Sequence, residues 1–263
     1  MPNTVRKRCS RLACVSLTIA AAAVLAACGE ADKPIKPLNL GSAPAASGTP
    51  IELERPSDPS GAIDFDRWPR ACELLTDDEI KAVLPQATKV ERESKHHETH
   101  VKQGIVASGR YASTRTVSAK DGECTFELDL PASGLRLSDL NPPKLNVYVD
   151  FAGTPKFVKQ NFPFSDPKDS IEVAGGACYH RSVAYCVKGP LAFRISSQFA
   201  HQEKDFGDPD LEWRDRYQVD GRTITISSPG GDSPEANEAF KRQRQLEFDH
   251  IFVELAKVIL RKI

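Results

Sequence analysis

Four cysteines that lie well inside the chain constrain its fold more than any other feature: Cys72, Cys124, Cys178 and Cys186. Four cysteines allow three disulfide connectivities. We expect nearest neighbours to pair, as Cys72–Cys124 and Cys178–Cys186. In a chain-entropy model the first loop, of about 52 residues, contributes about 4 kcal/mol, and the second contributes about 2.5 kcal/mol. No CxxC motif is present, which argues against a zinc ribbon and a thioredoxin-like redox pair.

A disulfide between Cys178 and Cys186 requires the backbone to turn back on itself between them. A straight strand would hold Cys178 and Cys186 about 27 Å apart, whereas a disulfide needs Cα atoms within about 7 Å. The chain must therefore reverse near His180-Arg181-Ser182.

The N-terminus indicates an oxidising compartment, in which such disulfides persist. Basic residues without any acidic one precede an apolar run from Leu12 to Ala27, which predicts a signal peptide over residues 1–27. The run ends in Leu25-Ala26-Ala27-Cys28-Gly29, which resembles the lipobox of bacterial lipoproteins. The alternative is an ordinary secretory signal with a chance cysteine.

The lipobox resemblance implies that Cys28 is diacylated, with palmitate-like chains, and becomes the mature N-terminus. Each buried methylene of such chains contributes about 0.8 kcal/mol to membrane binding. In a Gram-negative host, Gly29 in place of Asp implies the periplasmic face of the outer membrane. In an actinomycete the anchor would lie in the outer leaflet of the cytoplasmic membrane.

The charge of the mature chain limits its partners. Residues 1–27 contain four of the 35 Lys and Arg and none of the 36 Asp and Glu, so their removal leaves a net charge of about −5. This balance argues against nucleic acid as a partner and against a polybasic patch for anionic lipid.

A change in composition predicts the domain boundary. Residues 28–69 are rich in Pro, Ala, Gly and Ser and show no hydrophobic period, so we expect a lipidated Cys28 followed by a disordered tether. Residues 70–263 are then expected to form one disulfide-stapled domain.

Within that domain, helix and strand signals alternate. Thr76 and Glu79 form a capping-box pattern before a short helix that Pro85 stops. Thr154-Pro155 opens a middle helix, and Ser233-Pro234-Glu235 opens a long C-terminal one. Strands with alternating apolar residues cover 124–130 and 145–151, and hairpins are centred on 188–190 and on Asp220-Gly221. We predict an α+β fold with a mainly antiparallel sheet.

These motifs resemble one known family. A cysteine followed by ELLTDDEIKAVL, a second cysteine in DGECTFEL, and VAGGACYHRSVAYCVKGPLAFRIS are similar to the lipoproteins of the domain-of-unknown-function 3558 family. Those proteins are similar to the extracellular sensor domain of a mycobacterial Ser/Thr kinase. The resemblance covers roughly residues 70–199 and departs from the family pattern at Phe126, where Trp or Tyr is usual, and at Gly175-Gly176-Ala177. It implies a disulfide-stapled α+β fold with a cleft and no established catalytic residues.

One histidine cluster is the candidate metal site. His96, His97 and His100 in KHHETH offer imidazole ligands for Zn²⁺ or Cu²⁺. The surrounding segment is polar and without periodicity, so we expect a mobile surface loop and no bound metal or other cofactor.

The missing motifs favour binding over catalysis. The chain has no GxSxG, P-loop or GxGxxG motif. We expect a non-enzymatic envelope lipoprotein, held to the bilayer by acylated Cys28, that binds an unknown envelope ligand or protein through a cleft or a sheet face. The alternative is an immunity or inhibitor lipoprotein whose acidic segment 203–215 enters the basic cleft of an exported toxin or hydrolase.

Overall fold

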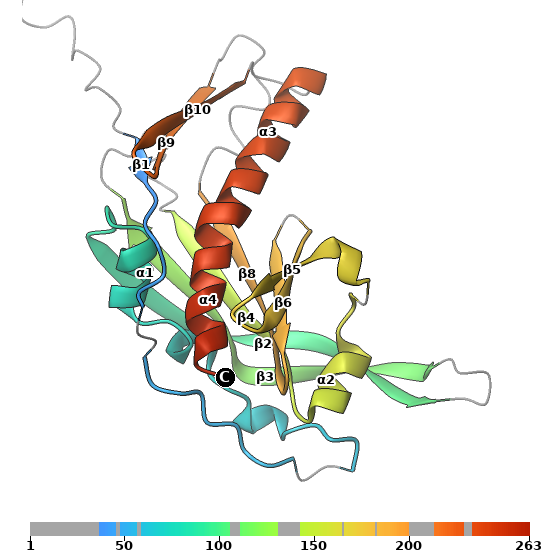
Figure 1. Ribbon diagram of the computed structural model, residues 1–263. Coiled ribbons are helices and arrows are strands. Elements are labelled where there is room, and N and C mark those ends of the chain that lie inside the picture. Colours follow the sequence, from blue (N-terminus) through green and yellow to red (C-terminus); the bar gives the residue numbers. More distant parts are fainter. Residues whose placement is uncertain are drawn as a thin grey trace, which may run out of the picture. The chain divides into compact units, whose positions relative to one another are not determined.

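A seven-stranded antiparallel sheet organises the domain (Figure 1). The computed structural model describes residues 37–45, 48–56, 59–105, 111–130, 143–164, 166–181, 183–199, 213–228 and 233–263. The predicted signal peptide and Cys28 lie outside these ranges. In spatial order the strands are β2 (Lys89–Ile105), β3 (Tyr111–Asp129), β4 (Lys144–Ala152), β8 (Leu191–Gln198), β7 (Ala184–Lys188), β6 (Gly176–His180) and β5 (Ser170–Val173).

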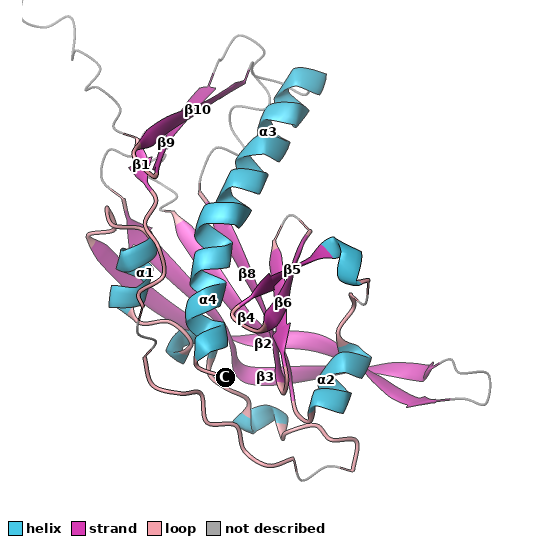
Figure 2. Cartoon of the chain, viewed as in Figure 1, coloured by secondary structure: helices cyan, strands magenta, loops and turns pink. Residues whose placement is uncertain are grey.

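The C-terminal helix crosses one face of this sheet (Figure 2). It runs through α3 (Pro234–Glu247), a π-helical turn η4 (Phe248–Phe252) and α4 (Val253–Arg261). Ser233 caps it as expected, because its side-chain oxygen accepts a hydrogen bond from the Ala236 amide at 3.0 Å. Within the described residues, no helix has both the length and the apolar character needed to cross a membrane.

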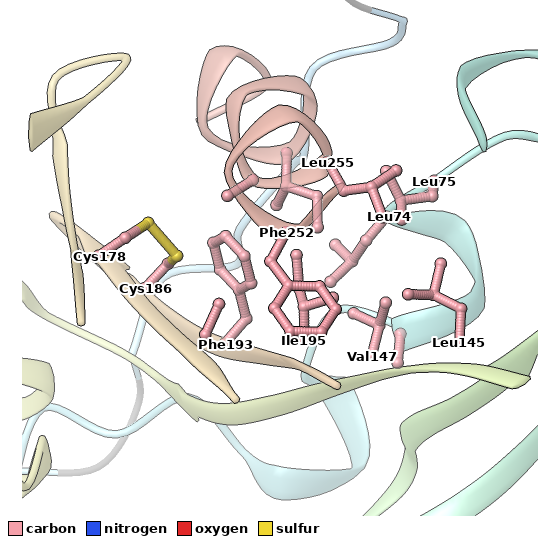
Figure 3. Close-up of a cluster of buried hydrophobic side chains, with 14 of the residues drawn as sticks. Leu74, Leu75, Leu145, Val147, Cys178, Cys186, Phe193, Ile195, Phe252 and Leu255 are labelled. Atoms are coloured by element: carbon pink, nitrogen blue, oxygen red, sulfur yellow. A yellow bond between two sulfur atoms is a disulfide. The ribbon is translucent and has the colours of Figure 1, made fainter. Parts of the chain in front are cut away.

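The core lies between this helix and the sheet (Figure 3). Alternate residues of β4 and β8 point toward the helix, and all are fully buried: Leu145, Val147, Phe193 and Ile195. They meet Phe252 and Leu255 of the helix. Burial of these side chains is the main stabilising term, at roughly 1.5–3 kcal/mol for each large apolar group.

Shorter helical segments complete the domain. The capping box of α1 (Asp77–Val83) is present, because the Thr76 hydroxyl accepts from the Glu79 amide at 3.2 Å and the Glu79 carboxylate accepts from the Thr76 amide at 2.7 Å. The middle helix is α2 (Pro155–Asn161), capped by Thr154. The part of the chain that the structure describes also contains the 3₁₀ turns η1 (Phe65–Arg67), η2 (Ala71–Glu73) and η3 (Pro167–Asp169).

A small second sheet lies beside α3. Its strands are β1 (Leu38–Asn39), β9 (Trp213–Val219) and β10 (Arg222–Ser228), of which β1 pairs with β9 in parallel. The predicted turn between β9 and β10 is confirmed. Asp220 and Gly221 there have φ of +48° and +76°, the left-handed values that a tight hairpin turn requires.

Both predicted disulfides are confirmed. Cys72 and Cys124 have Cα atoms 4.9 Å apart, and Cys178 and Cys186 have Cα atoms 4.1 Å apart. The latter two are direct partners across β6 and β7, so the chain does reverse between them. The α+β class and the long C-terminal helix are confirmed as well.

The predicted disordered tether is wrong for the described residues between 37 and 69. Leu38 and Ile63 are buried, and the Trp68 indole donates to the Ile63 carbonyl at 3.0 Å. The Ile51 amide donates to the Lys262 carbonyl at 2.8 Å. The apolar residues of this Pro-rich segment are too scattered to show a period, so the sequence did not indicate that they join the folded core.

Candidate functional site

The sheet face opposite the C-terminal helix carries a row of polar and aromatic side chains. Residues that pair directly across an antiparallel ladder lie on the same face. The strand register therefore aligns one residue from each of six neighbouring strands into what we call the cross-strand row: Lys95, Glu123, Tyr148, Arg194, Tyr185 and Tyr179. Since Val147, Phe193 and Cys186 alternate with members of this row and face the helix, the row faces away from it.

A buried network adjoins the row. The His97 Nε2 atom lies 3.0 Å from Asp150 Oδ1, and Arg194 lies 3.3 Å from the same oxygen. His97 and Asp150 are only 8% and 7% exposed. Because a carboxylate only accepts, the short contact requires that His97 Nε2 carry its proton toward Asp150. Asp150 thus holds both His97 and Arg194 in place.

Two irregularities in the ladders bring this network together. The register between β2 and β3 shifts at Lys95/His97, and the register between β4 and β8 shifts at Val149/Phe151. Such bulges re-aim side chains next to a strand. Here Asp150 lies between Val149 and Phe151, within the second shift. His97 is the residue at which regular pairing resumes after the first shift.

Glycine is required beside the first irregularity. A Cβ on Gly122 would lie 2.8 Å from the Ala119 Cβ and 2.9 Å from the His97 Cβ. We therefore expect Gly122→Ala to lower the free energy of unfolding by about 1–3 kcal/mol through overpacking. Urea denaturation would measure the loss, with Ser118→Ala on the exposed side of β3 as a control that changes it by less than about 0.5 kcal/mol. An unchanged urea midpoint in Gly122→Ala would mean that the atoms around Gly122 move to accommodate a methyl group without loss of stability.

Arg194 stands between two tyrosine rings. Its guanidinium carbon lies 4.3 Å from the Tyr148 ring centre and 5.6 Å from the Tyr185 ring centre. Cation–π attraction adds to the Asp150 contact, so the Arg194 guanidinium and the two tyrosine rings stabilise one another's positions. Burial, and then the nearby Glu123 carboxylate, raise the pKa of Tyr148 above its usual value. Tyr148 therefore stays neutral at physiological pH.

Further aromatic rings extend the row beyond Tyr185. Phe164 lies 4.7 Å from Tyr185 and stacks on Tyr179 with ring centres 5.4 Å apart. Phe162 lies 5.6 Å from Tyr179, and the Arg181 guanidinium lies 5.8 Å from Phe164. Phe164, Tyr185 and Tyr148 are half-buried, so each keeps part of its surface open to solvent.

The histidine cluster has a different structure from the one predicted. It lies in the middle of β2, so the prediction of a loop is wrong. His97 enters the buried network, whereas His96 is exposed and His100 bonds to Thr116 at 3.1 Å. Since neighbouring strand residues point to opposite faces, the three imidazoles do not converge. Among the described residues, no three His, Cys, Asp or Glu side chains are grouped in a way that could hold a metal ion.

The apolar positions of each strand predict the core but not this network. In KLNVYVDF, alternation places Leu145, Val147, Val149 and Phe151 in the core. The intervening Tyr148 and Asp150 were the available signal, since alternation places them together on the other face. Their partner Arg194 lies on a distant strand, which only the register identifies. Most of the acidic segment 203–215 lies outside the described residues.

Known proteins offer no further guide to this site. The chain matches no family model, and no curated protein or solved structure matches it. The resemblance to the domain-of-unknown-function 3558 lipoproteins therefore stays a prediction.

Proposed function

We propose that this chain is a lipid-anchored envelope protein whose domain binds a ligand or another protein and catalyses no reaction. The observation that carries the proposal is the cross-strand row, which places three tyrosines and an arginine together on a sheet face. Tyrosine and arginine are enriched where proteins bind one another, and they supply most hot spots.

The row is also held in place before any partner arrives. Arg194 is fixed by Asp150 and by two rings, and the Tyr148 hydroxyl is hydrogen-bonded to Ser196. Immobilising a free side chain on binding costs roughly 0.5–1.5 kcal/mol. Because these side chains are already ordered, a partner that docks here avoids much of that cost.

The chemistry around His97 supports a non-catalytic role. A histidine–carboxylate pair becomes catalytic when it activates a nearby nucleophile. The four described cysteines are all in disulfides, so none of them offers His97 a free thiol. The Ser196 hydroxyl is bonded to Tyr148 instead.

One experiment in the native host tests both parts of the proposal. Full-length protein is followed through membrane fractionation and chemical cross-linking in intact envelopes. We expect wild type to sediment with membranes and to give a discrete cross-linked product. Cys28→Ala should move to the soluble fraction, because it cannot be acylated. The double variant Tyr148→Ala/Tyr185→Ala should stay with membranes but lose the product.

Two outcomes would contradict this proposal. Membrane sedimentation of Cys28→Ala at the wild-type level would exclude the lipid anchor. An unchanged cross-linked product in the double tyrosine variant would exclude the row as the binding surface. Ile224→Ala, at an exposed position of β10, serves as the matched control and should behave as wild type.

A further inference from the structure

The spacing of the two half-exposed tyrosines is informative. Tyr148 and Tyr185 lie in the same row and are separated by the single strand that carries Arg194. Neighbouring strands are about 4.8 Å apart, so the two rings rise from the sheet about 9.6 Å apart. The Arg194 guanidinium lies between the Tyr148 and Tyr185 rings, so the two rings do not pack on each other and form two separate aromatic ridges.

We propose that the cross-strand row is a docking site for a proline-rich segment of another protein, which binds as a polyproline II helix with a Lys or Arg beside Glu123. A polyproline II helix repeats every three residues, or about 9.3 Å, which matches the spacing of the two rings. Aromatic ridges of this kind bind such segments because the helix is preformed and loses little entropy. The inference deepens the function proposed above and rests on it.

The charges along the row favour a basic ligand. Lys95 is paired with Glu93 at 2.8 Å, and Arg194 is paired with Asp150. Glu123 lies between Lys95 and Tyr148 in the row, and the Lys95 charge acts on both Glu93 and Glu123. One ammonium, that of Lys95, thus faces the two carboxylates of Glu93 and Glu123, so the net charge at this end of the row is negative. An anionic ligand would have to displace Asp150 from Arg194, whereas a cationic one pairs directly with Glu123.

The direction of the ligand follows from the same arrangement. Glu123, Tyr148 and Tyr185 are contributed by β3, β4 and β7, so a bound segment crosses the strands instead of adding to a sheet edge. Its basic residue lies over β3, and its prolines lie on the rings of Tyr148 and Tyr185.

The probe is a blocked nonapeptide, (Lys-Pro-Pro)₃, added to the full-length lipidated protein in detergent micelles, with binding followed by calorimetry. We expect saturable binding that weakens at least tenfold in Tyr148→Ala and in Tyr185→Ala. Glu123→Gln should weaken it about fivefold and reduce its dependence on salt. Ile224→Ala should bind as wild type does. A control peptide with alanine in place of proline should bind at least tenfold more weakly.

Separate variants keep the test valid if a truncation disturbs the fold. Tyr185→Phe keeps the ring, so it should bind within about twofold of wild type, and thermal melts confirm that each variant is folded. Absence of saturable binding at about 1 mM peptide overturns the inference. Equal binding of the alanine peptide, or of folded Tyr148→Ala and Tyr185→Ala, also overturns it. If the peptide fails while the cross-linked product still depends on both tyrosines, the binding surface stands and only its ligand class is wrong.

Discussion

Lys262→Met should destabilise the domain by about 3–5 kcal/mol, because it leaves a buried carboxylate without its cation. The Lys262 ammonium lies 2.7 Å from the Glu79 carboxylate and 2.9 Å from the Leu74 carbonyl. The side chains of Lys262 and Glu79 are 2% and 7% exposed. The same carboxylate also completes the capping box of α1, so Lys262 stabilises the start of that helix. Guanidinium denaturation would measure the loss.

A matched control and a double variant test the reason for this loss. Lys257→Met removes a partly exposed ion pair with Glu254 on the same helix, and we expect it to cost about 0–1 kcal/mol. Combining Lys262→Met with Glu79→Gln removes both charges and should recover part of the stability. If Lys262→Met costs no more than Lys257→Met, the buried pair contributes little.

The same pair predicts how stability depends on pH. Burial acts to raise the pKa of Glu79, but hydrogen bonds from Lys262, Thr76 and Gly48 outweigh it, so the pKa is lowered on balance. A lowered pKa in the folded state means that the stabilisation is complete above the pKa of a free Glu, about 4.3, and is lost as the pH falls through the folded value. As the pH falls from 5 into the acid range, wild type should lose more stability than the double variant Lys262→Met/Glu79→Gln, which has no carboxylate at position 79.

Removing the Cys72–Cys124 disulfide should cost about 4 kcal/mol. The two cysteines close a loop with a sequence separation of 52 residues, and the entropy that the cross-link removes from the unfolded chain grows with that length. The change is Cys72→Ala/Cys124→Ala, since Cys124 is fully buried and serine would bury a hydroxyl there. Thermal and urea unfolding of the folded fraction would measure it.

The second disulfide provides the comparison. It closes a separation of eight residues, so Cys178→Ala/Cys186→Ala should cost about 2.5 kcal/mol in the same model. Equal losses for the two double variants would show that packing around the sulfur atoms, and not loop closure, dominates. A larger loss of stability in Cys178→Ala/Cys186→Ala than in Cys72→Ala/Cys124→Ala would contradict the entropic explanation.

Local patterns predicted much of this fold. The capping box at Thr76, the proline after Thr154 and the Asp220-Gly221 turn act within a few residues, so each could be recognised in isolation. The strands around Cys124 and Val147 were predictable because one side of each faces the core and the other does not. The even count of four cysteines indicated two disulfides, and the expected nearest-neighbour pairing is the one observed.

Strand β2 shows where such patterns fail. Its inward residues Arg92 and Ser94 are polar, because it lies at the edge of the sheet and is only partly covered. Arg92 covers the core with its aliphatic stem, with its guanidinium 5.5 Å from the Phe126 ring, and it pairs with Asp77. A strand of this kind has no apolar alternation, so KHHETH could not be recognised as part of one.

The sequence alone predicted the cysteine pairs and the class of the fold, since these depend on composition and on neighbours along the chain. Only the tertiary structure decided that the described residues between 37 and 69 pack on the domain and that Lys262 completes the cap of α1. It also decided that Tyr148, Arg194 and Tyr185 share one row. The register of strands far apart in the sequence sets these contacts, and register is decided by the total burial of the whole sheet, which no short segment encodes.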